Sequence, residues 1–158
     1  YSIDDLDQGE GAVFLEQCQQ HIEQNGWCSF EGFLHPDAVV ALTEAKTLLP
    51  TAEKLTIKRT IYNGVADSSV PENDSRSQEY VHSTVQLADD QIPTETMIKP
   101  LYQSKKLTEF VRRVQKKNQL YPVADEFQGL NIVSLQADNW HAWHYDTIEC
   151  VVNLAITS

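Results

Sequence analysis

The chain has 158 residues, of which 12 are Lys or Arg and 23 are Asp or Glu, so its formal net charge is −11. This balance argues against a general nucleic-acid binder, because such proteins need a basic face to neutralise phosphates. The apolar stretches fall far short of the ~20 residues of a membrane span. The length and the 41% hydrophobic content are typical of one globular domain.

Three cysteines, Cys18, Cys28 and Cys150, are an odd number without C-x-x-C spacing. We therefore expect neither a disulfide framework nor a zinc knuckle, and reduced thiols in a cytoplasmic protein. No charged segment followed by an apolar stretch resembles a secretory signal.

The first part of the chain predicts helices. Residues 10–25 place apolar side chains at near-helical spacing and are followed by Gly26, which is typical of a helix with a C-terminal glycine. Residues 36–49 predict a second helix. Pro36 lies in its first turn, where the missing N–H costs nothing, and Pro50 ends it.

Strands and helices are mixed in the middle of the chain. Residues 55–62 and 80–87 predict strands, and the polar, Ser-rich residues 63–78 between them predict a loop. A loop of this length is typical of a functional or disordered segment. Helices are expected at 94–102 and 105–117.

The last part of the chain predicts a sheet. Ser104 is expected to cap the start of the helix at 105–117, which comes before this sheet. Three successive strands are then expected after the turn that ends at Gly129: residues 130–136, 140–145 and 148–157.

Residues 140–146, with the sequence Trp-His-Ala-Trp-His-Tyr-Asp, carry the strongest chemical pattern. Alternate side chains of an extended chain share a face, so His144 and Asp146 are expected to project to the same side. An imidazole and a carboxylate are two of the three ligands in a facial triad, which binds non-haem Fe(II) and leaves the opposite positions open. Zinc sites prefer four protein ligands, or three and water. The simpler interpretation is a solvated pair among packed aromatic residues.

Several segments carry a family resemblance: Gly32-Phe33-Leu34 before a helix, the Asp74–Arg76 loop, Pro100-Leu101-Tyr102 before a helix, Leu130-Asn131-Ile132, and His144-Tyr145-Asp146 before a Val-rich strand. Together, residues 26–156 resemble the iron and 2-oxoglutarate-dependent oxygenases, in particular the branch that hydroxylates or halogenates free amino acids. The resemblance implies an α+β fold with a double-stranded β-helix (jelly-roll) core and N-terminal helices packed on it.

The resemblance also implies the chemistry. His144 and Asp146 would bind Fe(II), with 2-oxoglutarate as cosubstrate and O2 as oxidant, and the substrate would be a small polar molecule, which we expect to be a free amino acid. Halogenating relatives carry a small residue in place of the carboxylate. Asp146 therefore favours hydroxylation.

Further residues are candidates for the site. His141 occupies a position whose counterpart in that branch contacts the substrate, although strand parity would turn it away from His144. Arg76 offers a bidentate fork for a substrate carboxylate, and Glu126 could meet an amine. The simpler interpretation of both is a solvated loop charge. His82, on an expected strand, could be a third metal ligand.

The family pattern places a second histidine and an arginine for 2-oxoglutarate after the H-x-D strand, and neither type of residue follows Asp146. We therefore expect residues 1–158 to be a single domain, the N-terminal part of a jelly-roll oxygenase truncated on its C-terminal side. Helices would span about 10–117, and ligand-bearing strands about 130–157. A degenerate protein is the other interpretation. Alone, these residues are expected to bind iron poorly and not to catalyse.

Two rival functions remain open. One is a non-catalytic jelly-roll binding or scaffold domain, whose aromatic cluster is only core. The other is a cupin-like zinc or iron enzyme that does not use 2-oxoglutarate. The pattern leaves open which substrate is oxidised and at which carbon, and the oligomeric state.

Overall fold

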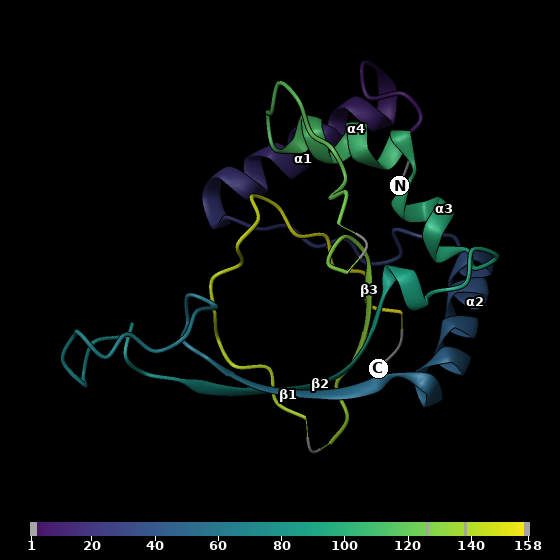
Figure 1. Cartoon of the computed structure of the whole chain (residues 1–158). Helices are drawn as coiled ribbons and strands as arrows, with labels where there is room; N and C mark the ends of the chain where they lie inside the picture. Colours follow the sequence, from purple (N-terminus) through teal and green to yellow (C-terminus); the bar gives the residue numbers. More distant parts are fainter. Residues whose placement is uncertain (1–2, 126, 138, 157–158) are drawn as a thin grey trace. The chain divides into compact units, whose positions relative to one another are not determined.

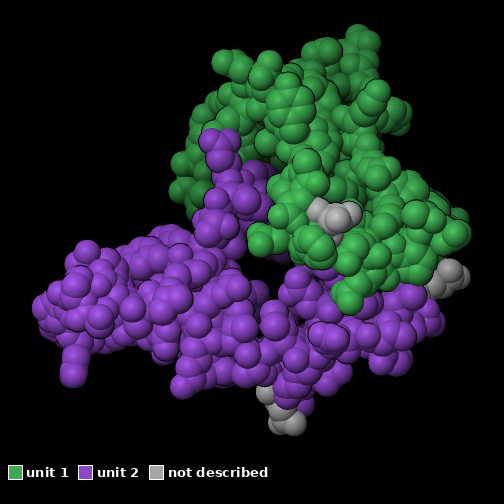
Figure 2. Space-filling model, viewed as in Figure 1, with its two compact units in different colours: residues 1–45, 89–130 green, residues 46–88, 131–158 purple. Residues whose placement is uncertain are grey.

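The computed structural model describes most of the chain, namely residues 3–125, 127–137 and 139–156, with Glu44 and Ala45 described by their backbone only. These residues form two compact units (Figure 2). Unit 1 contains residues 1–45 and 89–130, and unit 2 contains residues 46–88 and 131–158. In the part of the chain that is described, no helix is long and apolar enough to cross a membrane.

The four α-helices of the described residues all belong to unit 1 (Figure 1). They are α1 (Gly9–Asn25), α2 (Pro36–Thr43), α3 (Ile98–Tyr102) and α4 (Lys105–Val114). The expected stop of α1 is confirmed, because Gly26 has φ +79° and its N–H donates to the Ile22 carbonyl at 2.8 Å. The expected cap of α4 is also confirmed, because the Ser104 hydroxyl accepts from the Leu107 N–H at 3.3 Å.

Three helices are shorter than the sequence pattern predicts. The Thr43 hydroxyl bonds to the Val39 carbonyl at 2.8 Å, and α2 gives way there to the 3-10 helix η1 (Glu44–Thr51). Before α3, Thr96 donates its N–H and its hydroxyl to Pro93, which forms a turn in place of a helix start. The chain leaves α4 through Lys116, which has φ +52°.

The core of unit 1 forms between α1 and α4. Its centre is a group of aromatic rings, with Phe110 of α4 stacked on Phe14 of α1 at 5.4 Å between ring centroids. Phe30 approaches Phe14 edge-on at 5.1 Å. Leu15, Cys18 and other buried apolar side chains complete the cluster. Since rings in contact add to the free energy gained from burial alone, this cluster is the main stabilising element of unit 1.

Unit 2 is built on an antiparallel sheet with strand order β1-β2-β3. Its strands are β1 (Glu53–Arg59), β2 (Tyr80–Ala88) and β3 (Asn131–Ser134). β1 and β2 pair along their length, from Glu53 opposite Gln86 to Arg59 opposite Tyr80 (Figure 1). The short 3-10 helix η2 (Asp89–Gln91), which belongs to unit 1, follows β2. The helices and the antiparallel sheet together confirm the α+β class.

The last two expected strands are not formed. Within residues 140–145 only Trp140 makes a β-bridge, and residues 148–156 contain no strand. Their β-branched and aromatic content favours an extended chain, but a strand exists only where a neighbour offers its backbone groups. Apart from the bridge at Trp140 and a bend at 147–149, residues 140–156 therefore have no assigned secondary structure.

The aromatic cluster leads to a test of stability. Phe110 is 3% exposed and packs on three other rings, so Phe110→Ala should lower the free energy of unfolding by about 3–5 kcal/mol. Chemical denaturation followed by circular dichroism measures this loss. The same substitution at Phe127, which is 60% exposed, is the matched control and should cost within about 0.5 kcal/mol. Equal losses would contradict the proposed core.

Candidate metal centre

A single backbone pairing brings two histidines together. Ser83 of β2 and Trp140 exchange both backbone hydrogen bonds, at 2.6 and 2.9 Å, as an antiparallel pair. The next residues along the two segments, His82 and His141, must then lie opposite each other with their side chains on one face. Their ring centroids are 5.5 Å apart.

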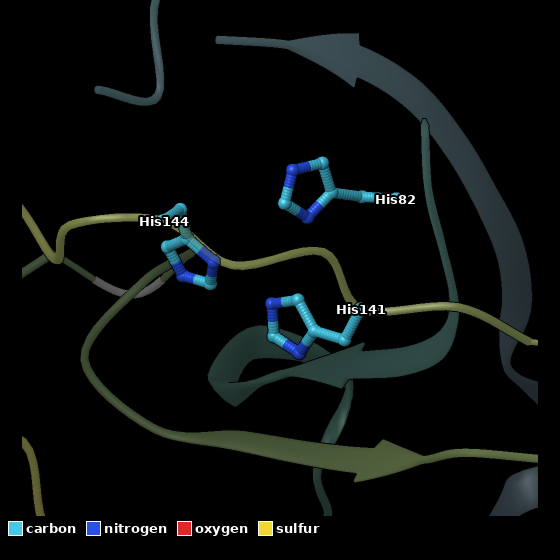
Figure 3. Close-up of side chains that lie close together, drawn as sticks. All are labelled: His82, His141 and His144. Atoms are coloured by element: carbon cyan, nitrogen blue, oxygen red, sulfur yellow. The ribbon is translucent and has the colours of Figure 1, made fainter. Parts of the chain in front are cut away.

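His144 lies beside these two rings because the chain changes direction after His141 and does not continue as a regular strand (Figure 3). Its ring stacks on His141 with 4.7 Å between centroids and an interplanar angle of 21°, and it lies 5.3 Å from the His82 ring. Strand parity predicted that His141 and His144 would point apart, and the bend brings them together. In Figure 3 each ring turns one nitrogen toward the space between the three. One ligand atom from each histidine lies within 4.8 Å of the other two.

Both nitrogens of His144 face oxygen atoms. Nδ1 lies 2.9 Å from the carbonyl oxygen of Ala142, and Nε2 lies 3.3 Å from Oδ1 of Asp146. His144 and Asp146 are therefore in contact, on the same side of the chain as the alternation of side chains predicted. The contacts hold the His144 ring in a fixed orientation.

His82 is the most enclosed of the three histidines. It is 6% exposed, and its Nε2 is buried with no hydrogen-bond partner among the described residues. Burial, followed by the charge of His144, lowers the pKa of His82, and the same two causes lower the pKa of His141. Asp146 opposes the lowering at His141. Lowered pKa values favour neutral imidazole, the form that binds metals.

Tyr145, between His144 and Asp146, is fastened to the segment that follows β1. Its N–H donates to the Ile61 carbonyl at 2.7 Å, and its carbonyl accepts from the Asn63 side chain at 2.8 Å. Its ring stacks on Tyr62 at 5.5 Å. A backbone hydrogen bond, a side-chain hydrogen bond and ring stacking thus connect residues 61–63, where the long polar loop starts, to the segment that carries His144 and Asp146.

Arg76 lies in that polar loop but not in the histidine cluster. It lines a hollow of about 340 Å³ on unit 2. The other lining residues are Thr60, Tyr62, Gly64, Val65 and Asp67. Its guanidinium is already engaged, because Nε and Nη2 donate to both carboxylate oxygens of Asp74 at 3.0 and 2.8 Å. A substrate carboxylate would have to displace Asp74.

Two observations complete the account of the predicted site residues. Glu126, the candidate for a substrate amine, lies outside the described residues. His82 was only a minor candidate in the sequence, because nothing local shows that β2 lies beside Trp140. The signal that could have found it is the presence of a histidine within an otherwise strand-like segment.

Comparisons with known proteins do not assign the chain to a family or a fold. It matches no protein-family model, no curated protein and no solved structure.

The Arg76–Asp74 pair gives a titration test. Hydrogen bonds from Arg76, above all those from its guanidinium, hold the pKa of Asp74 at about 2. Arg76→Gln should raise that pKa toward 3.8, the ordinary value, because the bidentate donor and its charge are both lost. A ¹³C NMR titration of the Asp74 carboxyl measures the change. Arg112→Gln, which removes the cation of a separate pair with Glu109, is the control and should leave Asp74 unchanged.

Proposed function

We propose that this chain belongs to a non-haem Fe(II) and 2-oxoglutarate-dependent oxygenase with a jelly-roll core, acting on a small polar substrate such as a free amino acid. The observation that carries the proposal is the contact between His144 and Asp146 beside two further histidines. The resemblance of residues 26–156 to that class adds the cosubstrate and the substrate type.

The residues present fit a mononuclear metal centre. Two ligands bound at ~2.1 Å to one metal are about 3.0 Å apart at a right angle and about 3.4 Å apart at a tetrahedral angle. The 3.3 Å between Nε2 of His144 and Oδ1 of Asp146 matches such a separation. His82 and His141 bring further imidazole nitrogens to the same place, so two histidines and a carboxylate, the donor set of a facial triad, are within one segment of unit 2.

The chain's own residues have separate tasks in this proposal. His144 and Asp146 would hold the metal, and iron with 2-oxoglutarate would supply the oxidising chemistry. The carboxylate of Asp146 takes the place that a halide would need, which favours hydroxylation. Arg76 is the candidate to hold a substrate carboxylate once Asp74 releases it, since its guanidinium lines the hollow beside Tyr62.

One specific observation favours a second function. Three histidines with ligand atoms within 4.8 Å of one another are a donor set that also occurs in catalytic zinc sites with an open fourth position. The alternative is therefore a cupin-like metalloenzyme that does not use 2-oxoglutarate. No contact in the described part of the chain favours the non-catalytic scaffold over these two.

An anaerobic titration tests the proposal. In the full-length protein, Fe(II) followed by 2-oxoglutarate should give the weak visible charge-transfer band of a chelated keto acid, and the band should disappear in His144→Ala because a metal ligand is lost. His35→Ala, which removes an exposed histidine from unit 1, is the matched control and should keep the band.

The other outcomes separate the alternatives. Iron binding without any band on addition of 2-oxoglutarate would favour the cupin-like enzyme. A folded protein that binds no metal would contradict both enzymatic functions and leave the scaffold domain.

A further inference from the structure

We propose that His82, His141 and His144 together bind one divalent transition metal through three ring nitrogens, and that Asp146 positions His144 rather than binding the metal. The inference rests on the proposed function in making His144 a metal ligand, and it revises the ligand set by replacing Asp146 with His82 and His141. It differs from the resemblance, which would use Asp146 and a histidine located after it.

The first support is the set of possible ligand atoms that lie close together. In the described part of the chain, the ligand atoms that lie within 4.8 Å of one another come from the three histidines, and Asp146 is outside this group. Nitrogens bound at ~2.1 Å to a tetrahedral metal are about 3.4 Å apart, so the cluster needs to close by up to about 1.4 Å. Side-chain rotation provides movements of that size, and the strands can stay in place.

The second support is the position of His82. It is 94% enclosed in the middle strand of the sheet, and its Nε2 has no hydrogen-bond partner among the described residues. A buried polar side chain without a partner is unfavourable and calls for a reason other than packing. The two imidazoles near His82 supply that reason, because one cation bound by all three rings would give His82 the partner that it lacks.

The third support is the pair of contacts at His144. A histidine that binds a metal through one nitrogen commonly donates its other N–H to a carboxylate, which fixes the ring and makes it a better ligand. Nε2 of His144 already faces Asp146 at 3.3 Å. The metal would then take Nδ1, which in the present structure faces the Ala142 carbonyl at 2.9 Å.

The ring planes show which side chain must move. A metal lies in the plane of every imidazole that binds it, and the nearly parallel rings of His141 and His144, with 21° between them, do not meet at a nearby point. Metal binding through Nδ1 of His144 breaks the contact with the Ala142 carbonyl, and the contact of Nε2 with Asp146 keeps the ring in place. His141 is exposed and makes no side-chain hydrogen bond to a described residue, so its ring is the one that rotates on metal binding.

The donor set also selects the cation. Three neutral imidazoles without a bound carboxylate suit Fe(II), Co(II), Ni(II), Cu(II) or Zn(II), whereas Mg(II) and Ca(II) require oxygen ligands. Zn(II) and Co(II) accept such a site with a fourth position left to water or substrate. We therefore assign the cluster to a cation of this class.

Co(II) binding to the untagged chain tests the ligand set. His82→Leu, His141→Leu and His144→Leu should each weaken Co(II) binding at least about 100-fold, since outer-shell partners alone cost 10–100-fold. Asp146→Asn should weaken binding by no more than that, and should leave the visible Co(II) spectrum of the bound form unchanged, because the ligands are the same. His35→Leu is the control and should change neither quantity.

Either of two results would overturn the inference. One is a His82 or His141 variant that binds Co(II) within about threefold of the unsubstituted chain. The other is an Asp146→Asn variant whose bound Co(II) spectrum changes, which would make the carboxylate a ligand. Circular dichroism of the metal-free variants shows whether each one is folded.

A measurement without substitutions covers the case in which a His82 variant does not fold. With ¹⁵N-labelled imidazoles, one equivalent of Zn(II) should shift the ring nitrogens of three of the five histidines, while His21 and His35 keep their signals. An unshifted His82 signal would overturn the inference.

The failure of this inference and the failure of the proposed function are distinguishable. Metal binding by the three histidines with no charge-transfer band on addition of 2-oxoglutarate supports the inference and contradicts the oxygenase. A band that persists in His82→Leu supports the oxygenase and overturns the inference.

Discussion

The pairing of Ser83 with Trp140 is the contact on which the histidine cluster depends. Two backbone hydrogen bonds place residues from distant parts of the chain in register, and the register alone sets His82 opposite His141. A slip by one residue would turn one of these rings to the other face. His144 is only three residues from His141, so a local change in chain direction is enough to bring it to the cluster. The histidine cluster of unit 2 thus depends on a backbone pairing that involves no titratable group.

Features that depend on neighbouring residues were predictable from the sequence, and features that depend on distant ones were not. Gly26 and Ser104 mark helix ends because each acts on the turn next to it. The extended segments after Gly129 were predicted as strands from their composition, but only residues 131–134 find a partner along β2. Strand composition indicates a preference for extended chain and does not indicate what lies beside it.

The same distinction applies to the candidate site. His144 and Asp146 are two residues apart, so the alternation of side chains was enough to predict that they share a side. Parity failed for His141, because a bend in the chain lies outside any regular period. Arg76 was predicted to bind a substrate carboxylate or to be a solvated loop charge, and the structure pairs it with Asp74, two residues away, where a turn brings the side chains together.

Tyr145 has a consequence for the entropy of ligand binding. Its N–H and its carbonyl are both used in bonds to the segment after β1, and its ring rests on Tyr62. The backbone on each side of it, which carries His144 and Asp146, has therefore lost much of its conformational freedom before any ligand arrives, and ordering one residue costs about 1–2 kcal/mol. The folding of unit 2 meets that cost in advance, so a ligand at this segment would bind to a preorganised backbone.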